Sequence, residues 1–108
     1  MTVTGPISAA AVSVINVPTS GLQVIDGQAV AAGQTVLLVG QATASQNGLW
    51  VAATGAWARH SSFPTGSALA AVAVTVTSGA VWAGTSWQPM LAGSAVTVDT
   101  SPQWWYRR

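Results

Sequence analysis

Turn signals interrupt the chain at short and regular intervals, and this spacing constrains the fold more than any other feature of the sequence. The signals combine glycine, proline, asparagine, aspartate and serine, and they occur at Pro18, Asp26-Gly27, Gly33, Asn47-Gly48, Gly55, Pro64 to Gly66, Ser78-Gly79, Gly84, Gly93 and Pro102. The segments between them have the length of the short strands found in sandwiches and barrels. The spacing therefore predicts an all-β fold.

Two segments carry the clearest strand patterns. In residues 72–77, Val72, Val74 and Val76 share one face and alternate with Ala and Thr. A period of two predicts a strand that is buried on one face. Residues 35–39 form a continuous apolar run, which predicts a strand covered on both faces.

A hairpin is expected around Asn47-Gly48, because these two residue types accept positive φ and favour tight turns. It would pair residues 36–39 with residues 49–51. Further strands are predicted at 11–17, 22–25, 81–83, 95–98 and 103–106.

These elements predict a single small antiparallel β-sandwich or β-barrel with hairpins and little or no helix. Residues 15–108 would form one β-domain. Residues 1–14 would form either its first strand or an ordered N-terminal arm. Such an arm, with Thr2 and Val3, could add a strand to the sheet edge of a neighbouring copy, although a frayed tail remains an alternative.

Charge is scarce: the chain has three Arg, two Asp and no Lys or Glu, so 5% of its residues are charged. Ordinary soluble domains carry about 25%. The low positive charge argues against nucleic-acid binding, and no apolar run approaches the length of a transmembrane helix. A nearly uncharged surface favours association, so we expect the chain to pack against copies of itself or a larger assembly.

Few residues could carry chemistry. His60 is the only histidine, Asp26 and Asp99 are the only carboxylates, and there is no cysteine. These residues are too few for a metal site and show no nucleophile motif, so we expect no enzyme, no metal and no cofactor. We interpret Asp26 and Gly27 as a turn in which Asp26 bonds its local backbone, and His60 as a surface residue.

Six tryptophans are a high number for 108 residues. Most of them are expected to fill the core. As an alternative, an exposed patch could contact a ligand such as a glycan, and its candidates are Trp57, Arg59, His60 and Phe63.

The C-terminal residues Trp104, Trp105 and Tyr106 cannot all lie in the core, because adjacent side chains of a strand point to opposite faces. Either Trp105 or the Trp104/Tyr106 pair must be covered by something else, such as another subunit. The predicted interface comprises Thr2, Val3, Trp104, Trp105, Tyr106, Arg107 and Arg108.

Several spaced motifs resemble a module of tailed-bacteriophage virion proteins. Residues 21–27 read GLQVIDG, residues 32–39 AGQTVLLV, residues 46–51 QNGLWV, residues 55–59 GAWAR and residues 83–87 AGTSW. The module is similar in its order of I-D-G, A-G-x-x-V-L, N-G and G-x-W-x-R signatures over about residues 15–106. Gly40, Gln34-Thr35 and His60 depart from it, and each departure removes a charge.

The resemblance implies a virion structural or adhesion role without catalytic residues. It leads us to expect a head (capsid) decoration protein that is made in the host cytoplasm and resides in the virion. Its partners would be the major capsid protein and copies of itself, with no nucleic acid and no membrane. The alternatives are a tail-fibre or receptor-binding module that contacts host glycans, and a tail or connector component.

Overall fold

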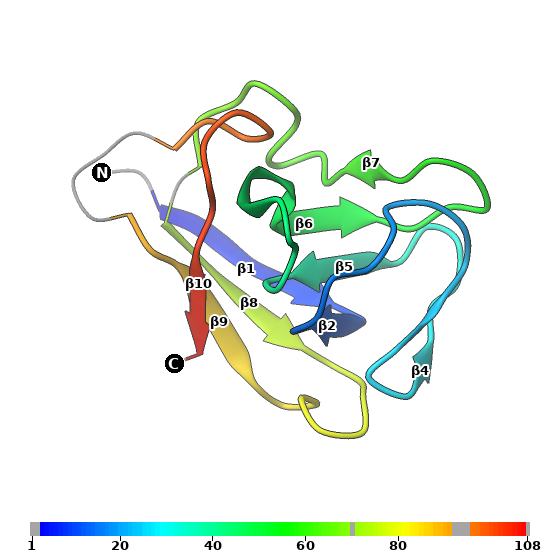
Figure 1. Ribbon diagram of the computed structural model, residues 1–108. Coiled ribbons are helices and arrows are strands. Elements are labelled where there is room, and N and C mark those ends of the chain that lie inside the picture. Colours follow the sequence, from blue (N-terminus) through cyan, green and yellow to red (C-terminus); the bar gives the residue numbers. More distant parts are fainter. Residues whose placement is uncertain (1–2, 70, 92–95, 108) are drawn as a thin grey trace.

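The computed structural model describes residues 3–69, 71–91 and 96–107, and within them the chain is almost entirely β-structure (Figure 1). The all-β prediction is confirmed. The first large sheet has the order β1 (Val3–Ala9), β8 (Ala71–Val76), β9 (Ser86–Pro89), β10 (Trp105–Arg107). The second has the order β2 (Ala11–Ser13), β5 (Thr35–Leu38), β6 (Gly48–Val51), β7 (Ala58–Arg59). A hairpin of β3 (Val24–Ile25) and β4 (Gln28–Ala29) and a 3₁₀ turn, η1 (Ala44–Gln46), complete the described elements.

The two large sheets share one pairing scheme. In each, an N-terminal strand runs parallel to its neighbour, and the remaining strands are antiparallel. The sheets are therefore mixed, whereas purely antiparallel sheets were predicted. Only Ala10 separates β1 from β2, so one stretch of chain enters both sheets. Residues 3–13 thus pair within their own chain, as the first-strand alternative for the N-terminal segment expects.

The larger core cluster lies between the two sheets. Val72, Val74 and Val76 of β8 are buried in it, while Ala73 and Thr75 are half-exposed. The predicted period-two burial is confirmed. The second sheet contributes Leu37 and other apolar side chains to the same cluster.

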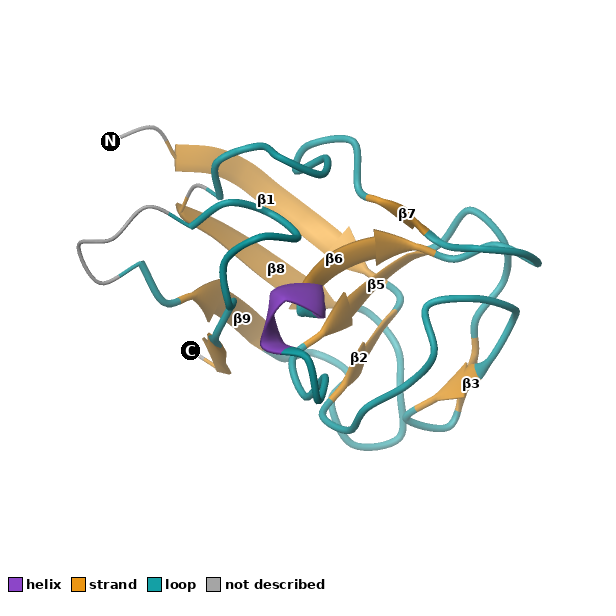
Figure 2. Ribbon diagram, turned by 45° about the horizontal axis from the view of Figure 1, so that its top comes forward, coloured by secondary structure: helices purple, strands orange, loops and turns teal. Residues whose placement is uncertain are grey.

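A second core cluster lies on the other face of the second sheet. Val36 and Leu38 of β5 point into it, whereas Leu37 points into the first, so β5 is buried on both faces as predicted. The β3–β4 hairpin covers this second cluster with Ile25. Figure 2 shows the resulting order, with β1, β8 and β9 on one side, β2, β5 and β6 in the middle and β3 beyond them.

The predicted pairing of residues 36–39 with 49–51 is confirmed, but its turn is not at Asn47-Gly48. Leu38 pairs with Gly48, and the connection runs through η1. Asn47 has a φ of −65° and a buried side chain, so it does not adopt the positive φ expected of it. Gly48, with a φ of +115°, is already the first residue of β6.

Two other predicted strands are wrong in position. Residues 81–83 form a turn that leads into β9. In the predicted strand 95–98, residue 95 lies outside the described residues, and the described part contributes only an isolated bridge between Thr97 and Ala68.

Candidate interaction surfaces

Arg59 and Asp99 form an ion pair inside the protein. Nε and Nη2 of Arg59 donate to Oδ1 of Asp99 at 3.0 and 2.6 Å. One hydrogen on Nη1 and one on Nη2 go to the carbonyl oxygens of Asn47 and Ser45, both at 2.9 Å. The guanidinium also lies over the ring of Trp50, 3.9 Å from its centroid. With only 3% of its side chain exposed, Arg59 serves as an internal connector and is not available to a ligand.

The same contacts affect the pKa of the Asp99 carboxyl. Burial alone would raise its pKa, but hydrogen bonds from Arg59 and Thr65 and the positive charge of Arg59 outweigh this effect. The pKa of Asp99 therefore lies below its usual value, and the carboxylate stays charged. This arrangement suits a structural ion pair better than a general acid, which needs a pKa near neutrality.

Asp26 makes a long-range contact where a local one was expected. Its φ of +50° and the +74° of Gly27 fit the turn between β3 and β4, which confirms the predicted turn. The carboxylate, however, accepts hydrogen bonds from the amides of Val81 and Trp82. The expected Asx bond to its local backbone is wrong. Asp26 instead fixes the β8–β9 loop against the hairpin.

Asn47 and Gln103 form a second internal connection. The Asn47 side chain accepts from the amide of Gln41 at 2.8 Å and donates to the carbonyl of Gln103 at 2.9 Å. Trp105 Nε1 donates to the Gln103 side chain at 3.1 Å. Asn47 therefore joins the end of η1 to the segment before β10, and neither Asn47 nor Gly48 forms the predicted hairpin turn.

The predicted exposed ligand patch is wrong, because both of its aromatic members are buried. Trp57 is 6% exposed and donates through Nε1 to the carbonyl of Gly21, and Phe63 is 4% exposed. Arg59 is occupied by Asp99. His60 is half-exposed, and its Nδ1 accepts from the amide of Ser62 at 3.1 Å. Burial lowers the pKa of His60, which favours the neutral imidazole.

The C-terminal strand resolves the alternative that the sequence left open. Trp105 is buried in the first core cluster, while Trp104 is 57% and Tyr106 46% exposed. Met90 is also exposed, and its amide donates to the carbonyl of Trp104. We call Met90, Trp104 and Tyr106 the aromatic ridge. Of the other predicted interface residues, Val3 lies in β1, Arg107 ends β10, and Thr2 and Arg108 lie outside the described residues.

A second apolar surface surrounds a hollow of about 160 Å³. We call it the apolar groove, and its walls are Val12, Ser13, Val14, Ile15, Val17, Val24, Ile25, Asp26 and Trp82. Val14, Ile15 and Val24 in its walls are exposed. Val81, whose amide is bonded to Asp26, is also exposed but does not line the groove. The sequence predicted strands over most of these residues and did not indicate this surface, because a β-branched pattern does not distinguish a covered apolar residue from an exposed one.

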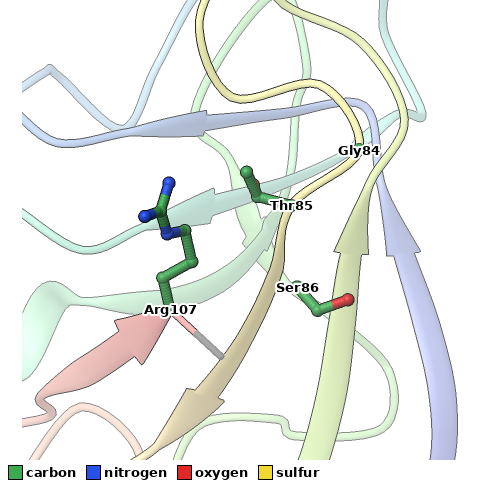
Figure 3. Close-up of a pocket in the computed structure, with 4 residues that line it drawn as sticks. All are labelled: Gly84, Thr85, Ser86 and Arg107. Carbon is green, nitrogen blue, oxygen red and sulfur yellow. The ribbon is translucent and has the colours of Figure 1, made fainter.

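A wider polar cleft of about 470 Å³ lies beside Arg107, between Gly84, Thr85 and Ser86 (Figure 3). The Thr85 hydroxyl is already engaged, since it donates to the carbonyl of Trp82 and accepts from Trp87 Nε1. Ser86 points away from Arg107 in Figure 3. The guanidinium of Arg107 lies 5.7 Å from the ring centroid of Trp82. This cleft offers a single charged group and no converging polar set.

Among the described residues, no cluster of three or more His or Asp side chains is arranged to hold a metal ion. Within the same residues, no helix has both the length and the apolar character needed to cross a membrane. No protein-family model matches the chain, and comparisons with curated proteins and with solved structures return no significant match. Most of the large apolar side chains that are exposed among the described residues lie in the apolar groove or the aromatic ridge.

Proposed function

We propose that this chain is a non-enzymatic structural protein of a bacteriophage virion, of the capsid-decoration type, which binds the shell and neighbouring copies of itself. The observation that carries the proposal is the pair of exposed apolar surfaces on a chain with 5% charged residues. Exposed apolar patches of several hundred Å² are typical of interaction sites. Because the sequence motifs resemble those of virion modules, we propose that these surfaces are covered in the phage particle.

Both Asp side chains are held in contacts within the chain, and this supports a structural role. The carboxylate of Asp99 is paired with Arg59, and that of Asp26 accepts backbone amides from another loop. Each contact joins parts of the chain that are far apart in sequence. Rigid support would come from burial of apolar surface, at about 25 cal/mol for each Å² removed from water.

The proposal is tested with shells of the phage that encodes the chain, prepared without it. Purified protein is added, and bound copies are counted after sedimentation. We expect saturable binding at many copies per shell and a higher temperature of shell disruption. Binding of only a few copies per particle, or none, would exclude decoration. The exposed-site variant Thr54→Asp serves as a control that keeps wild-type binding.

A second candidate is a receptor-binding module that contacts host glycans, with the protein located in the tail. The specific observation in its favour is an exposed indole beside an amide and a phenol. Tyr106 Oη donates to Gln88 Oε1 at 2.7 Å, next to the exposed Trp104. Such a set offers a stacking face and hydrogen-bonding groups to a sugar. A glycan array with labelled protein distinguishes the two candidates, since decoration requires shell binding and no glycan binding.

A further inference from the structure

Asn47 and Gly48 form the only Asn-Gly pair of the chain, and this pair has a characteristic side reaction. Glycine has no side chain to hinder the approach, so its backbone nitrogen can attack the side-chain amide carbon of the preceding asparagine. A bond forms between this nitrogen and Cγ, the bond from Cγ to Nδ2 breaks, and ammonia leaves with the proton of the attacking nitrogen. Water then opens the succinimide ring at either carbonyl. The products are aspartate and isoaspartate, in which the main chain runs through the side-chain carbons.

The fold holds Asn47 by each of its polar atoms. Its backbone N–H donates to the carbonyl of Ala44 at 3.1 Å, and its own carbonyl accepts from Nη1 of Arg59 at 2.9 Å. Oδ1 accepts from the amide of Gln41 at 2.8 Å, and Nδ2 donates to the carbonyl of Gln103 at 2.9 Å. The side-chain amide is therefore fixed between two segments that lie far apart in the sequence.

Burial and backbone geometry also oppose the attack. Asn47 is 0% exposed, and its ψ of 161° belongs to extended backbone where the turn η1 leads into β6 (Figure 2). To bring the Gly48 nitrogen onto Cγ, the chain must rotate about this bond and about the side-chain bonds. This rotation breaks both side-chain hydrogen bonds and leaves a buried donor and a buried acceptor unpaired. Gly48 is buried as well, so its N–H is shielded from the base that must remove the proton.

We propose that Asn47 is a deamidation site whose reaction is controlled by folding. In the folded protein, ring closure requires local opening of the segment from η1 to β6, so the rate falls with the fraction of time that this segment is open. In the unfolded chain, Asn47 reacts at the rate of a free Asn-Gly pair. The extent of deamidation therefore reports how long a chain has been unfolded. This property needs no partner and is independent of the proposed function.

The products do not fit the place that Asn47 occupies. An aspartate there still accepts from the Gln41 amide, but its carboxylate has no hydrogen to donate to the carbonyl of Gln103. Two acceptors then face each other in the interior. Isoaspartate adds a carbon atom to the main chain directly before the pairing of Leu38 with Gly48. A chain that is deamidated while unfolded should therefore refold to a less stable protein.

The test compares the two asparagines of the chain in folded and in unfolded protein. Asn16 is the internal control, because it is exposed and precedes Val17, whose branched side chain hinders the same attack. Protein is incubated in mildly alkaline buffer with or without urea and is then digested with pepsin at low pH, which stops the reaction. Mass spectrometry follows the conversion of amide to acid in each asparagine peptide.

In urea, we expect Asn47 to convert well before Asn16. In the folded protein, the Asn47 rate should fall by more than about a hundredfold, whereas the Asn16 rate should fall far less. Gly48→Ala tests the chemistry in urea, where its effect on the folded state is irrelevant. Its added methyl group should remove most of the Asn47 conversion.

A second pair of variants tests the product. Asn47→Asp should have a lower urea midpoint than the wild type or should fail to fold, while the matched control Asn16→Asp keeps the wild-type midpoint. Three results would each overturn the inference: equal Asn47 rates with and without urea, an Asn47 that reacts no faster than Asn16 in urea, and an Asn47→Asp variant as stable as the wild type.

Discussion

Arg59 and Asp99 lie forty positions apart in the sequence, and their ion pair joins β7 to the segment that precedes β10. Asp99 holds this position with a φ of +67°, a conformation that asparagine and aspartate tolerate better than most residues. The pair thus links the second sheet to the last strand of the first sheet. It is the one ion pair among the described residues.

Replacing Asp99 with asparagine should destabilise the protein by about 2 kcal/mol or more, because it leaves the buried Arg59 guanidinium without a counter-charge. Asparagine keeps the side-chain shape and accepts the positive φ, so the change isolates the charge. Thr65→Val, which removes only a hydrogen bond to Asp99, should cost about 1 kcal/mol. Urea denaturation measures both, and equal losses would contradict the ion-pair argument.

The single histidine should give stability a weak dependence on pH. Burial lowers the folded-state pKa of His60 below its unfolded value near 6.5, so the unfolded chain binds the proton more readily. The contribution is therefore fully present above pH 6.5 and is lost as pH falls through the folded pKa. Urea denaturation between pH 5 and pH 8 measures this slope. His60→Asn keeps a hydrogen-bond acceptor near the Ser62 amide and should flatten the curve; an unchanged slope in this variant would assign the effect to other groups.

Two glycines give a contrast in the combined cost of backbone strain and side-chain collision near the ion pair. Gly48 has a φ of +115°, and a Cβ there would collide with the Gln103 side chain and approach Arg59 Nη1 at 2.9 Å. Gly48→Ala should therefore cost about 2–4 kcal/mol. At Gly55 a Cβ would meet nothing within 4 Å, so Gly55→Ala should change stability by less than about 0.5 kcal/mol. Thermal unfolding of the two variants gives the comparison, and similar melting temperatures would contradict it.

The adjacent residues Trp104 and Trp105 should respond oppositely to truncation. Trp105→Ala empties a core site and should cost about 3–5 kcal/mol. Trp104→Ala removes an exposed side chain and should change the stability of the monomer by less than about 0.5 kcal/mol while weakening self-association. Chemical denaturation and sedimentation together separate the two effects. A large loss of stability in Trp104→Ala would assign that side chain to the core.

Local sequence patterns predicted those strands and turns that depend mainly on interactions between residues close in sequence. The alternation of residues 72–77 identified both the β8 strand and its buried face, because burial of one face imposes a period of two. The apolar run at 35–39 likewise identified the doubly covered β5. The Asp26-Gly27 turn followed from residues that accept positive φ.

Long-range contacts account for what the sequence did not predict. Val12 and Leu37 pair in parallel, as do Thr4 and Val72, and no local pattern encodes a partner so far along the chain. Asn47 was misplaced because its alternative, a buried bond to Gln103, lies 56 positions away. The predicted exposure of Trp57 failed for the same reason, since its indole is fixed by the distant Gly21 carbonyl.

The parallel pairing of β1 with β8 has a consequence for biosynthesis. The strand β1 acquires its neighbour in the sheet only after β8, up to Val76, has been synthesised. Until then, a nascent chain carries an open strand edge that other polypeptides can capture. Rapid translation would shorten that interval, and early chaperone contact would cover the open edge while it lasts.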